Sequence, residues 1–285
     1  MGLLEQTKWY AVFLGAGRKI GRKPAPMADA FFRNRTIDTR YRIEGEGPVV
    51  TFIHGIGSNL DAWDSVLEHF GPGYRILRYD LRGFGQSTRI KGRYEIGAFV
   101  EDLMNLLHHL EIERCHLVGF SLGGLIAQAA ALMYPDTFDR LVLASTLGAI
   151  DEDDQAFLDD RYAQLLKGDP GWEKAIANYF SPEFLAANPG HIEKLKADRA
   201  KNDPEIFAMA YRIIAESDFA PYLHQIRSKT LVFTGEHDRA SPRMAHAMAA
   251  EIPDAEAKVL EGLRHNLLVE DPRLMAATIR DFLDG

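Results

Sequence analysis

The sequence predicts an α/β fold, in which a mostly parallel β-sheet is covered by helices on both faces and is interrupted by an inserted helical segment. Three observations predict it. From about residue 31, short apolar segments alternate with segments of helical periodicity. The alternation stops between about residues 151 and 222 and then resumes to the C-terminus. Alternating strands and helices favour right-handed crossovers and a parallel sheet.

The first part of the chain contains five strand candidates with helix candidates between them. The apolar residues between about Tyr94 and Leu110 recur at three- and four-residue spacing, which is typical of an amphipathic helix. Two further helices are expected over 60–70 and 122–134. The strands are expected at RYRIEG (40–45), PVVTFIHG (48–55), YRILRYD (74–80), RCHLVGF (114–120) and DRLVLAST (139–146).

Residues 151–222 offer no strand candidate, only helical stretches separated by prolines. This segment holds 15 Asp or Glu against 8 Lys or Arg, so it carries nearly all of the net charge of −8. Strands then return at 229–238 and 256–262, with helices around 242–250 and from Pro272 to Leu283. A sheet that resumes after an insertion indicates one core, residues 30–150 and 223–285, carrying a helical cap, residues 151–222.

Composition excludes several classes of function. The pI of about 5.7 gives no basic field for nucleic acid, and no apolar run approaches the roughly 18 residues that cross a bilayer. The single cysteine, Cys115, cannot form an internal disulfide, which fits a reducing compartment, and we expect a cytoplasmic protein. Residues 1–29 form a basic extension whose charges mostly follow its short apolar stretch, the reverse of a secretory signal.

The stretch HLVGFSLGGLIAQ, residues 116–128, places glycines around a single serine between an expected strand and an expected helix. A sharp strand-to-helix turn would force Ser121 into a backbone conformation with positive φ. Side chains two residues away on either side would then collide, and Gly119 and Gly123 remove them. This pattern is a nucleophile elbow. The alternative is a glycine-rich turn in which the serine only caps the helix.

A serine hydroxyl becomes a useful nucleophile only when a base removes its proton and an acid orients that base. In this type of fold the order along the chain is serine, acid, histidine. His265, in the loop between the last strand and the last helix, is the candidate base for Ser121. The loop after the strand at 229–238 offers Glu236 and Asp238, of which we select Asp238.

An oxyanion hole completes such a site with backbone N–H groups. The Leu122 N–H, directly after the nucleophile, is one candidate donor. The loop FIHGIGSN after the strand at 48–55 offers the Ile56 N–H, with Gly55 and Gly57 allowing the backbone to approach a substrate. We expect His54 to form local hydrogen bonds within this loop.

Five motifs, HGIGSNLDAWD, YDLRGFGQS, GFSLGG, GEHDRASP and GLRHNLLVEDP, occur in the order and spacing of the α/β-hydrolase family, which the chain resembles over about residues 31–285. ILRYDLRGFGQS and LEIERCHLVGFSLGG are most similar to enol-lactone hydrolases and related serine carboxylesterases. The resemblance implies an eight-stranded, mostly parallel sheet with an inserted cap. No motif typical of a metal site is present, and no cofactor is expected.

The expected function is that of a serine hydrolase, which cleaves a small carboxylic ester or lactone through an acyl-enzyme intermediate. Relatives with an aspartate nucleophile are disfavoured by Ser121. Relatives that cleave carbon–carbon bonds in ring-fission products carry a tryptophan after the histidine, where this chain has Asn266, so that reading stays only as an alternative. A second alternative is a binding protein on the same fold with slow turnover.

The cap is expected to supply the substrate pocket, with no partner other than a small molecule; the oligomeric state stays open. Its aromatic residues are Tyr162, Trp172, Tyr179, Phe180, Phe184, Tyr211 and Phe219. From these we select Trp172, Tyr162 and Phe180 as pocket residues. Arg161, Arg199 and Arg212 are available as anchors for an anionic group, and we select Arg161. The acidic cap works against a doubly charged anion, because its field would repel it unless one arginine dominates locally, so a neutral or singly charged small ester is an equal alternative.

Overall fold

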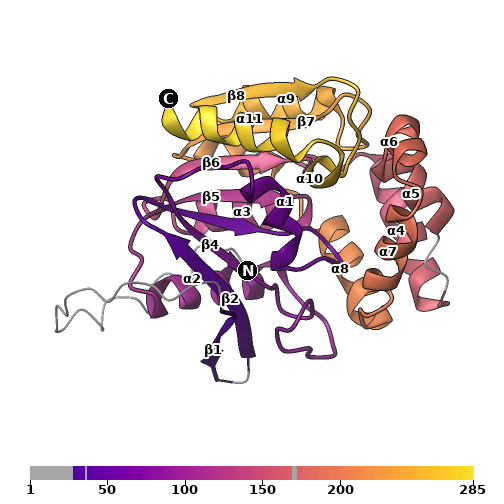
Figure 1. Ribbon diagram of the computed structural model, residues 1–285, viewed down its shortest axis with the longest axis horizontal. Helices are drawn as coiled ribbons and strands as arrows, with labels where there is room; N and C mark the ends of the chain where they lie inside the picture. The colour runs from indigo at the N-terminus through magenta and orange to yellow at the C-terminus, as the bar shows by residue number, and fades with distance from the viewer. Residues whose placement is uncertain (1–27, 36, 169–171) are drawn as a thin grey trace.

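The computed structural model describes residues 28–35, 37–168 and 172–285, except for the side chains of 172–175 (Figure 1). Its centre is an eight-stranded sheet with the order β1-β2-β4-β3-β5-β6-β7-β8. β2 runs antiparallel to both of its neighbours, and all pairs from β4 to β8 are parallel. The strands are Ala30–Asn34 (β1), Ile37–Gly45 (β2), Val49–Ile53 (β3), Arg75–Tyr79 (β4), Cys115–Phe120 (β5), Phe138–Ala144 (β6), Lys229–Gly235 (β7) and Ala255–Leu260 (β8).

Helices cover both faces, and the apolar runs of the central strands supply a core on each side. One hydrophobic cluster contains α2, α3 and α9, and the other contains α10 and α11. Side-chain oxygens begin two of these helices: Ser241 accepts from the Met244 N–H at α9, and Asp271 accepts from the Leu274 N–H at α11. The helices of the core are η2 (Leu60–Trp63), α1 (Asp64–Leu67), α2 (Ile96–His109), α3 (Leu122–Met133), η3 (Ala220–Gln225), α9 (Pro242–Glu251), α10 (Leu267–Glu270) and α11 (Pro272–Asp284).

Between β6 and β7 the described residues form five α-helices, gathered at one end of the sheet in Figure 1, followed by the 3₁₀ helix η3. The α-helices are α4 (Glu152–Leu166), α5 (Trp172–Tyr179), α6 (Pro182–Ala187), α7 (His191–Arg199) and α8 (Pro204–Glu216). Asp151 caps α4 by accepting from the Asp154 N–H, and the buried faces of α4 and α8 join the larger core cluster. The cap denotes residues 151–222, the boundaries predicted from the sequence.

The fold class predicted from the sequence is confirmed, and the eighth strand is β1, which the residue pattern did not mark. β1 is a five-residue edge strand with alternating, only partly buried positions, so its apolar signal is weak. The helix expected over 60–70 is a 3₁₀ turn followed by the short α1. Residues 1–27 of the expected extension lie outside the described residues.

The turn between β5 and α3 has the geometry expected from its glycines. Ser121 has φ of 56° and ψ of −117°. A Cβ on Gly119 would lie 2.3 Å from the Gly123 carbonyl oxygen, and a Cβ on Gly123 would lie 2.3 Å from the Ile53 carbonyl oxygen. Both contacts are with backbone atoms, which cannot rotate away. The bend therefore depends on glycine at these two positions.

We expect Gly119→Ala to lower the free energy of unfolding by more than about 2 kcal/mol, because its methyl group has no space. Gly97, a partly buried residue in the first turn of α2, is the matched control, because a Cβ there meets nothing within 4 Å. Gly97→Ala should raise the free energy of unfolding by about 0.5–1 kcal/mol. Chemical denaturation measures both values, and a Gly119→Ala protein as stable as the wild type would contradict this description of the bend.

Candidate active site

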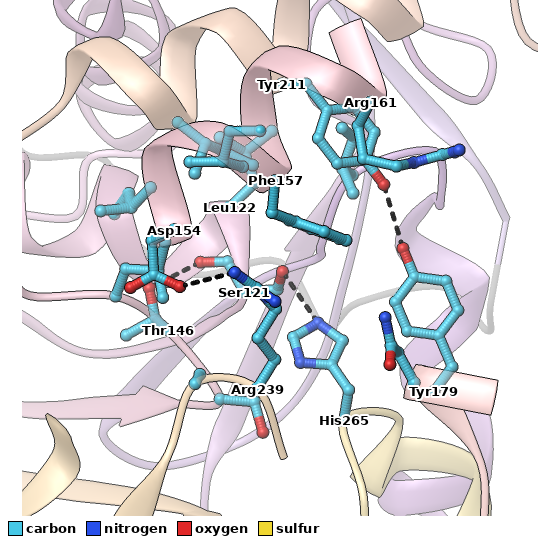
Figure 2. A pocket seen from close by; sticks show the side chains of 18 residues that line it. Ser121, Leu122, Thr146, Asp154, Phe157, Arg161, Tyr179, Tyr211, Arg239 and His265 are labelled. Carbon is cyan, nitrogen blue, oxygen red and sulfur yellow. Dashed lines mark hydrogen bonds and ion pairs between the residues drawn. The ribbon is translucent and has the colours of Figure 1, made fainter. Parts of the chain in front are cut away.

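Three side chains predicted from separate loops meet at the carboxyl ends of the parallel strands. Ser121 follows β5, Asp238 follows β7, and His265 lies between β8 and α10. His265 Nε2 lies 3.2 Å from Ser121 Oγ (Figure 2). On the other side of the ring, His265 Nδ1 lies 2.9 Å from Asp238 Oδ1. The alternative acid, Glu236, accepts instead from the Gly262 N–H. The arrangement can pass a proton from the hydroxyl to the imidazole while the carboxylate orients the ring.

Burial and charge act in opposite directions on this group. Burial disfavours the imidazolium, but the Asp238 charge and hydrogen bond outweigh it and raise the pKa of His265. Burial alone would raise the pKa of Asp238, and His265 lowers it below the usual aspartate value. Thr234 Oγ1 and the Ala240 N–H also donate to Asp238. The carboxylate is therefore held ionised and in one orientation.

The loop after β3 lies against Ser121, as expected. A Cβ on Gly55 would lie 3.3 Å from Ser121 Cβ. Within the described residues no hydrogen-bond partner is found for the Ile56 N–H, and the Leu122 N–H begins α3, where no intrahelical acceptor exists. These two N–H groups are the ones predicted to form the oxyanion hole, and that role stays a proposal.

Two buried polar residues hold this loop in place. His54 Nε2 accepts from the Leu81 N–H at 3.0 Å, so Nδ1 carries the proton and donates to the Gly55 carbonyl at 2.8 Å. Burial lowers the pKa of His54, which keeps it neutral. Asp80 accepts from the Leu60 N–H at 2.7 Å and is fully buried. The local hydrogen bonding expected for His54 is present.

The cap is bonded to the loop that carries His265. The Asn266 N–H donates to the Tyr179 carbonyl at 3.0 Å, and the Arg264 guanidinium donates to the Ala177 carbonyl at 2.7 Å. The Glu270 carboxylate joins the two parts, because its oxygens accept from the Ser181 N–H at 2.6 Å and the Arg264 N–H at 2.8 Å. The position of the imidazole and the position of the cap are therefore coupled.

An apolar cavity of about 90 Å³ lies between Ser121 and the cap (Figure 2). Its wall also contains Tyr179 and Tyr211, whose hydroxyl oxygens lie 3.1 Å apart. Burial alone would raise the pKa of Tyr179, but the positive charges of Arg199 and His265 lower it to about 8. The apolar side chains of this wall are Ile56, Leu122, Leu125, Leu147, Phe157, Leu158 and Ile214.

A second, wider space also reaches Ser121 and His265. We call it the polar cleft. Its walls include the loop over residues 55–59, Gln86 and Arg89 of the core, and Lys194, Arg199 and Asn202 of the cap. The Asn202 side chain donates to the Gly57 carbonyl at 3.1 Å, so the cap also contacts the loop that carries Ile56.

The four residues selected as substrate-binding have different outcomes. Arg161 lines the apolar cavity. Tyr162 and Phe180 do not: Arg212 covers the Tyr162 ring, and Phe180 is buried against the stacked ring of Phe184. The helical spacing of aromatic residues predicts that their side chains are buried. It does not predict whether a buried side chain lines the cavity or packs against other residues of the cap. The side chain of Trp172 lies outside the described residues.

Several residues at the site were not selected from the sequence. Tyr179 and Tyr211 belong to the aromatic set of the cap but were not selected from it, although both face the cavity. Arg239 lies next to Asp238 and forms an ion pair with Asp154 of the cap at 3.2 Å. Glu270 has only one cue, its place in the motif after His265.

Residues 48–272 match the model of the alpha/beta hydrolase fold family, and the chain therefore belongs to that family. It is 32% identical over 198 residues to 3-oxoadipate enol-lactonase 2 of Acinetobacter baylyi, covering 68% of this chain and 73% of that protein. A second protein of the same organism, (E)-2-((N-methylformamido)methylene)succinate hydrolase, is 27% identical over 88% of this chain and 95% of its own length.

Among solved structures, the enol-lactonase from Burkholderia xenovorans superimposes with a TM-score of 0.83 at 25% identity, covering 90% of this chain and all of that one. A hydrolase from Pseudomonas aeruginosa gives a TM-score of 0.84 at 28% identity, covering 92% of this chain and all of that one. These relatives support the resemblance to enol-lactone hydrolases. None of the helices in the described residues is both long and apolar enough to span a membrane.

We expect Glu270→Gln to lower the free energy of unfolding by about 1–3 kcal/mol, because one amide oxygen cannot replace a charged acceptor for two N–H groups. Hydrogen–deuterium exchange of the Ser181 and Arg264 amides should accelerate. Glu261→Gln is the control, because no partner for the exposed Glu261 carboxylate is found among the described residues. Unchanged exchange at both amides would show that Glu270 does not couple cap and loop.

Proposed function

We propose that this protein is a serine hydrolase that cleaves a small carboxylic ester or lactone. The observation that carries the proposal is the chain of contacts from Ser121 through His265 to Asp238, with distances of 3.2 Å and 2.9 Å. The positive φ of Ser121 adds to it, because strained backbone of this kind is typical of a nucleophile elbow. The enol-lactonase relatives support the same class of substrate.

In the first step, Ser121 Oγ attacks the carbonyl carbon while its proton moves to His265 Nε2. The carbonyl oxygen becomes an oxyanion, to which the Ile56 and Leu122 N–H groups would donate. The bond from carbon to the leaving oxygen then breaks, and His265 returns its proton to that oxygen. The products of this step are an alcohol, or the ring-opened hydroxyl of a lactone, and an acyl group esterified to Ser121.

Water then repeats the sequence. His265 Nε2 takes a proton from the water as its oxygen bonds to the acyl carbon, and the same proton returns to Ser121 Oγ as the acyl bond breaks. A carboxylic acid is released, and the enzyme returns to its starting state. Asp238 stays ionised throughout and stabilises the imidazolium that forms in each half of the cycle.

We expect Ser121→Ala to lower kcat by several orders of magnitude, ~10⁶-fold by comparison with other triads. The substrates are p-nitrophenyl esters of increasing chain length and five- and six-membered lactones. A serine-directed organophosphonate should label the wild-type protein stoichiometrically on Ser121, as read by peptide mass spectrometry. Activity within tenfold of wild type in Ser121→Ala would overturn the assignment, and a protein that does not label would favour the binding-protein alternative.

The pH dependence follows from the raised pKa of His265. Only the neutral imidazole can take the serine proton, so kcat/KM should fall as the pH drops through the His265 pKa, at a midpoint above the usual histidine value near 6.5.

Asp238→Asn removes the charge that raises the pKa of His265 and leaves burial, which lowers it. The pKa should therefore move down, measured by NMR titration of the imidazole, and kcat should fall ~10⁴-fold. An unchanged or higher pKa in the variant would contradict this.

A further inference from the structure

The two spaces at the site meet at the proposed reaction centre and differ in chemistry. Ile56, Ser121, Tyr179 and His265 line both the apolar cavity and the polar cleft. A substrate whose carbonyl carbon lies at Ser121 Oγ can therefore extend in two directions. What each direction accepts depends on its walls.

The walls of the apolar cavity are mostly hydrocarbon. Its two residues of opposite charge, Asp154 and Arg239, form an ion pair at 3.2 Å, and the Arg239 guanidinium lies 4.0 Å from the centre of the Phe157 ring. The Arg161 guanidinium donates to the Gln164 side chain and lies 5.4 Å from the centre of the Tyr211 ring. A short apolar chain fits these walls better than a charged one.

The polar cleft has an excess of positive charge. Its cations are Arg40, Arg89, Lys194, Arg199 and Lys201, and its acidic residues are Asp61, Asp64 and Asp198. Arg40 is buried and paired with Asp29, Asp61 and Asp80, so the excess comes from the other four cations. Each of the three acidic residues is in an ion pair: Asp61 with Arg40 and Arg42, Asp64 with Arg78, and Asp198 with Lys201.

Two cations of α7, Lys194 and Arg199, lie on the cap side of the cleft. Within the part of the chain that the structure describes, no carboxylate is found paired with Lys194 or Arg199. Arg199 lies 4.9 Å from the centre of the Tyr179 ring, next to His265. Positive charge is therefore present where the polar cleft approaches the reacting atoms.

The order of events distinguishes the two halves of an ester. The acyl group stays on Ser121 until water attacks, whereas the alcohol must leave and water must enter before that attack. The wider, polar space suits the group that leaves and the water that replaces it. The apolar cavity suits the group that stays.

From these observations we infer that, provided the proposed function holds, the enzyme's substrates join a short apolar acyl group, held in the apolar cavity, to an anionic alcohol, held in the polar cleft beside Lys194 and Arg199. The net negative charge of the cap does not argue against an anion in this cleft. The acidic residues of α4 that dominate its charge, Glu152, Asp153, Asp159 and Asp160, are exposed and do not line the cleft.

The test compares butyrate esters that share one acyl-enzyme and differ in the charge of the alcohol: phenyl butyrate, 4-carboxyphenyl butyrate and its 4-trimethylammonium analogue. Lys194→Glu is the variant. Lys196→Glu on the same helix is the control, because Lys196 pairs with Glu193 and does not line the cleft. Comparing each ester's kcat/KM in the variant with its value in the wild type cancels the intrinsic reactivity of the leaving group.

We expect Lys194→Glu to lower the ratio of kcat/KM for 4-carboxyphenyl to phenyl butyrate by ~10-fold, and to raise the ratio for the ammonium ester. Lys196→Glu should leave both ratios within about twofold, because Lys196 does not line the cleft and its charge lies farther from a substrate held there. Monophenyl succinate, in which the anion is on the acyl side, should have a kcat/KM at least ~10-fold below that of phenyl butyrate in the wild type.

Equal effects of the two lysine variants, or a monophenyl succinate that is hydrolysed faster than phenyl butyrate, would overturn the inference. If Ser121 is labelled by the organophosphonate in the same preparation, the proposed function stands while the inference fails. A protein that neither labels nor hydrolyses any of the esters would overturn both.

Discussion

Backbone crowding at the turn between β5 and α3 is the constraint on which the rest of the site depends. The chain must reverse direction within one residue, and the Gly123 and Ile53 carbonyl oxygens leave no space for a Cβ at Gly119 or Gly123. The turn is further fixed by Thr146, whose hydroxyl donates to the Ser121 carbonyl at 2.8 Å. With the turn fixed, the Ser121 hydroxyl stands above the sheet edge, where the loops after β3, β7 and β8 also end.

The cap contributes to the site in two ways. It covers the serine with Tyr179 and Tyr211, and it bonds to the two loops that the proposed chemistry needs. Glu270 and the Tyr179 carbonyl hold the His265 loop, and Asn202 holds the loop that carries Ile56. A movement of the cap would therefore shift both the imidazole and the candidate oxyanion donor, so that covering the substrate and assembling the reacting groups are linked.

Much of the core could be predicted because its signals are local. Gly119 and Gly123 lie within five residues of each other and indicate that the turn between them has no space for side chains. Asp238 and His265 follow strands of a parallel sheet, and the carboxyl ends of such strands meet at one edge. The cap could not be predicted in the same detail. A buried aromatic residue such as Phe180 has the same helical spacing whether it faces a cavity or its neighbours, and net charge does not say whether Asp159 or Lys194 faces the substrate. β1 was missed because an edge strand needs little apolar sequence once β2 is available as its partner.

The measurement that tests most directly whether Ser121 is the nucleophile is rapid-quench mass spectrometry during turnover of p-nitrophenyl butyrate. We expect a butyryl group on the peptide that contains Ser121, formed at the rate of the first nitrophenolate release and lost at the rate of steady-state turnover. Nitrophenolate released with no adduct on Ser121, or with the adduct on another residue, would contradict the acyl-enzyme and the site built around it.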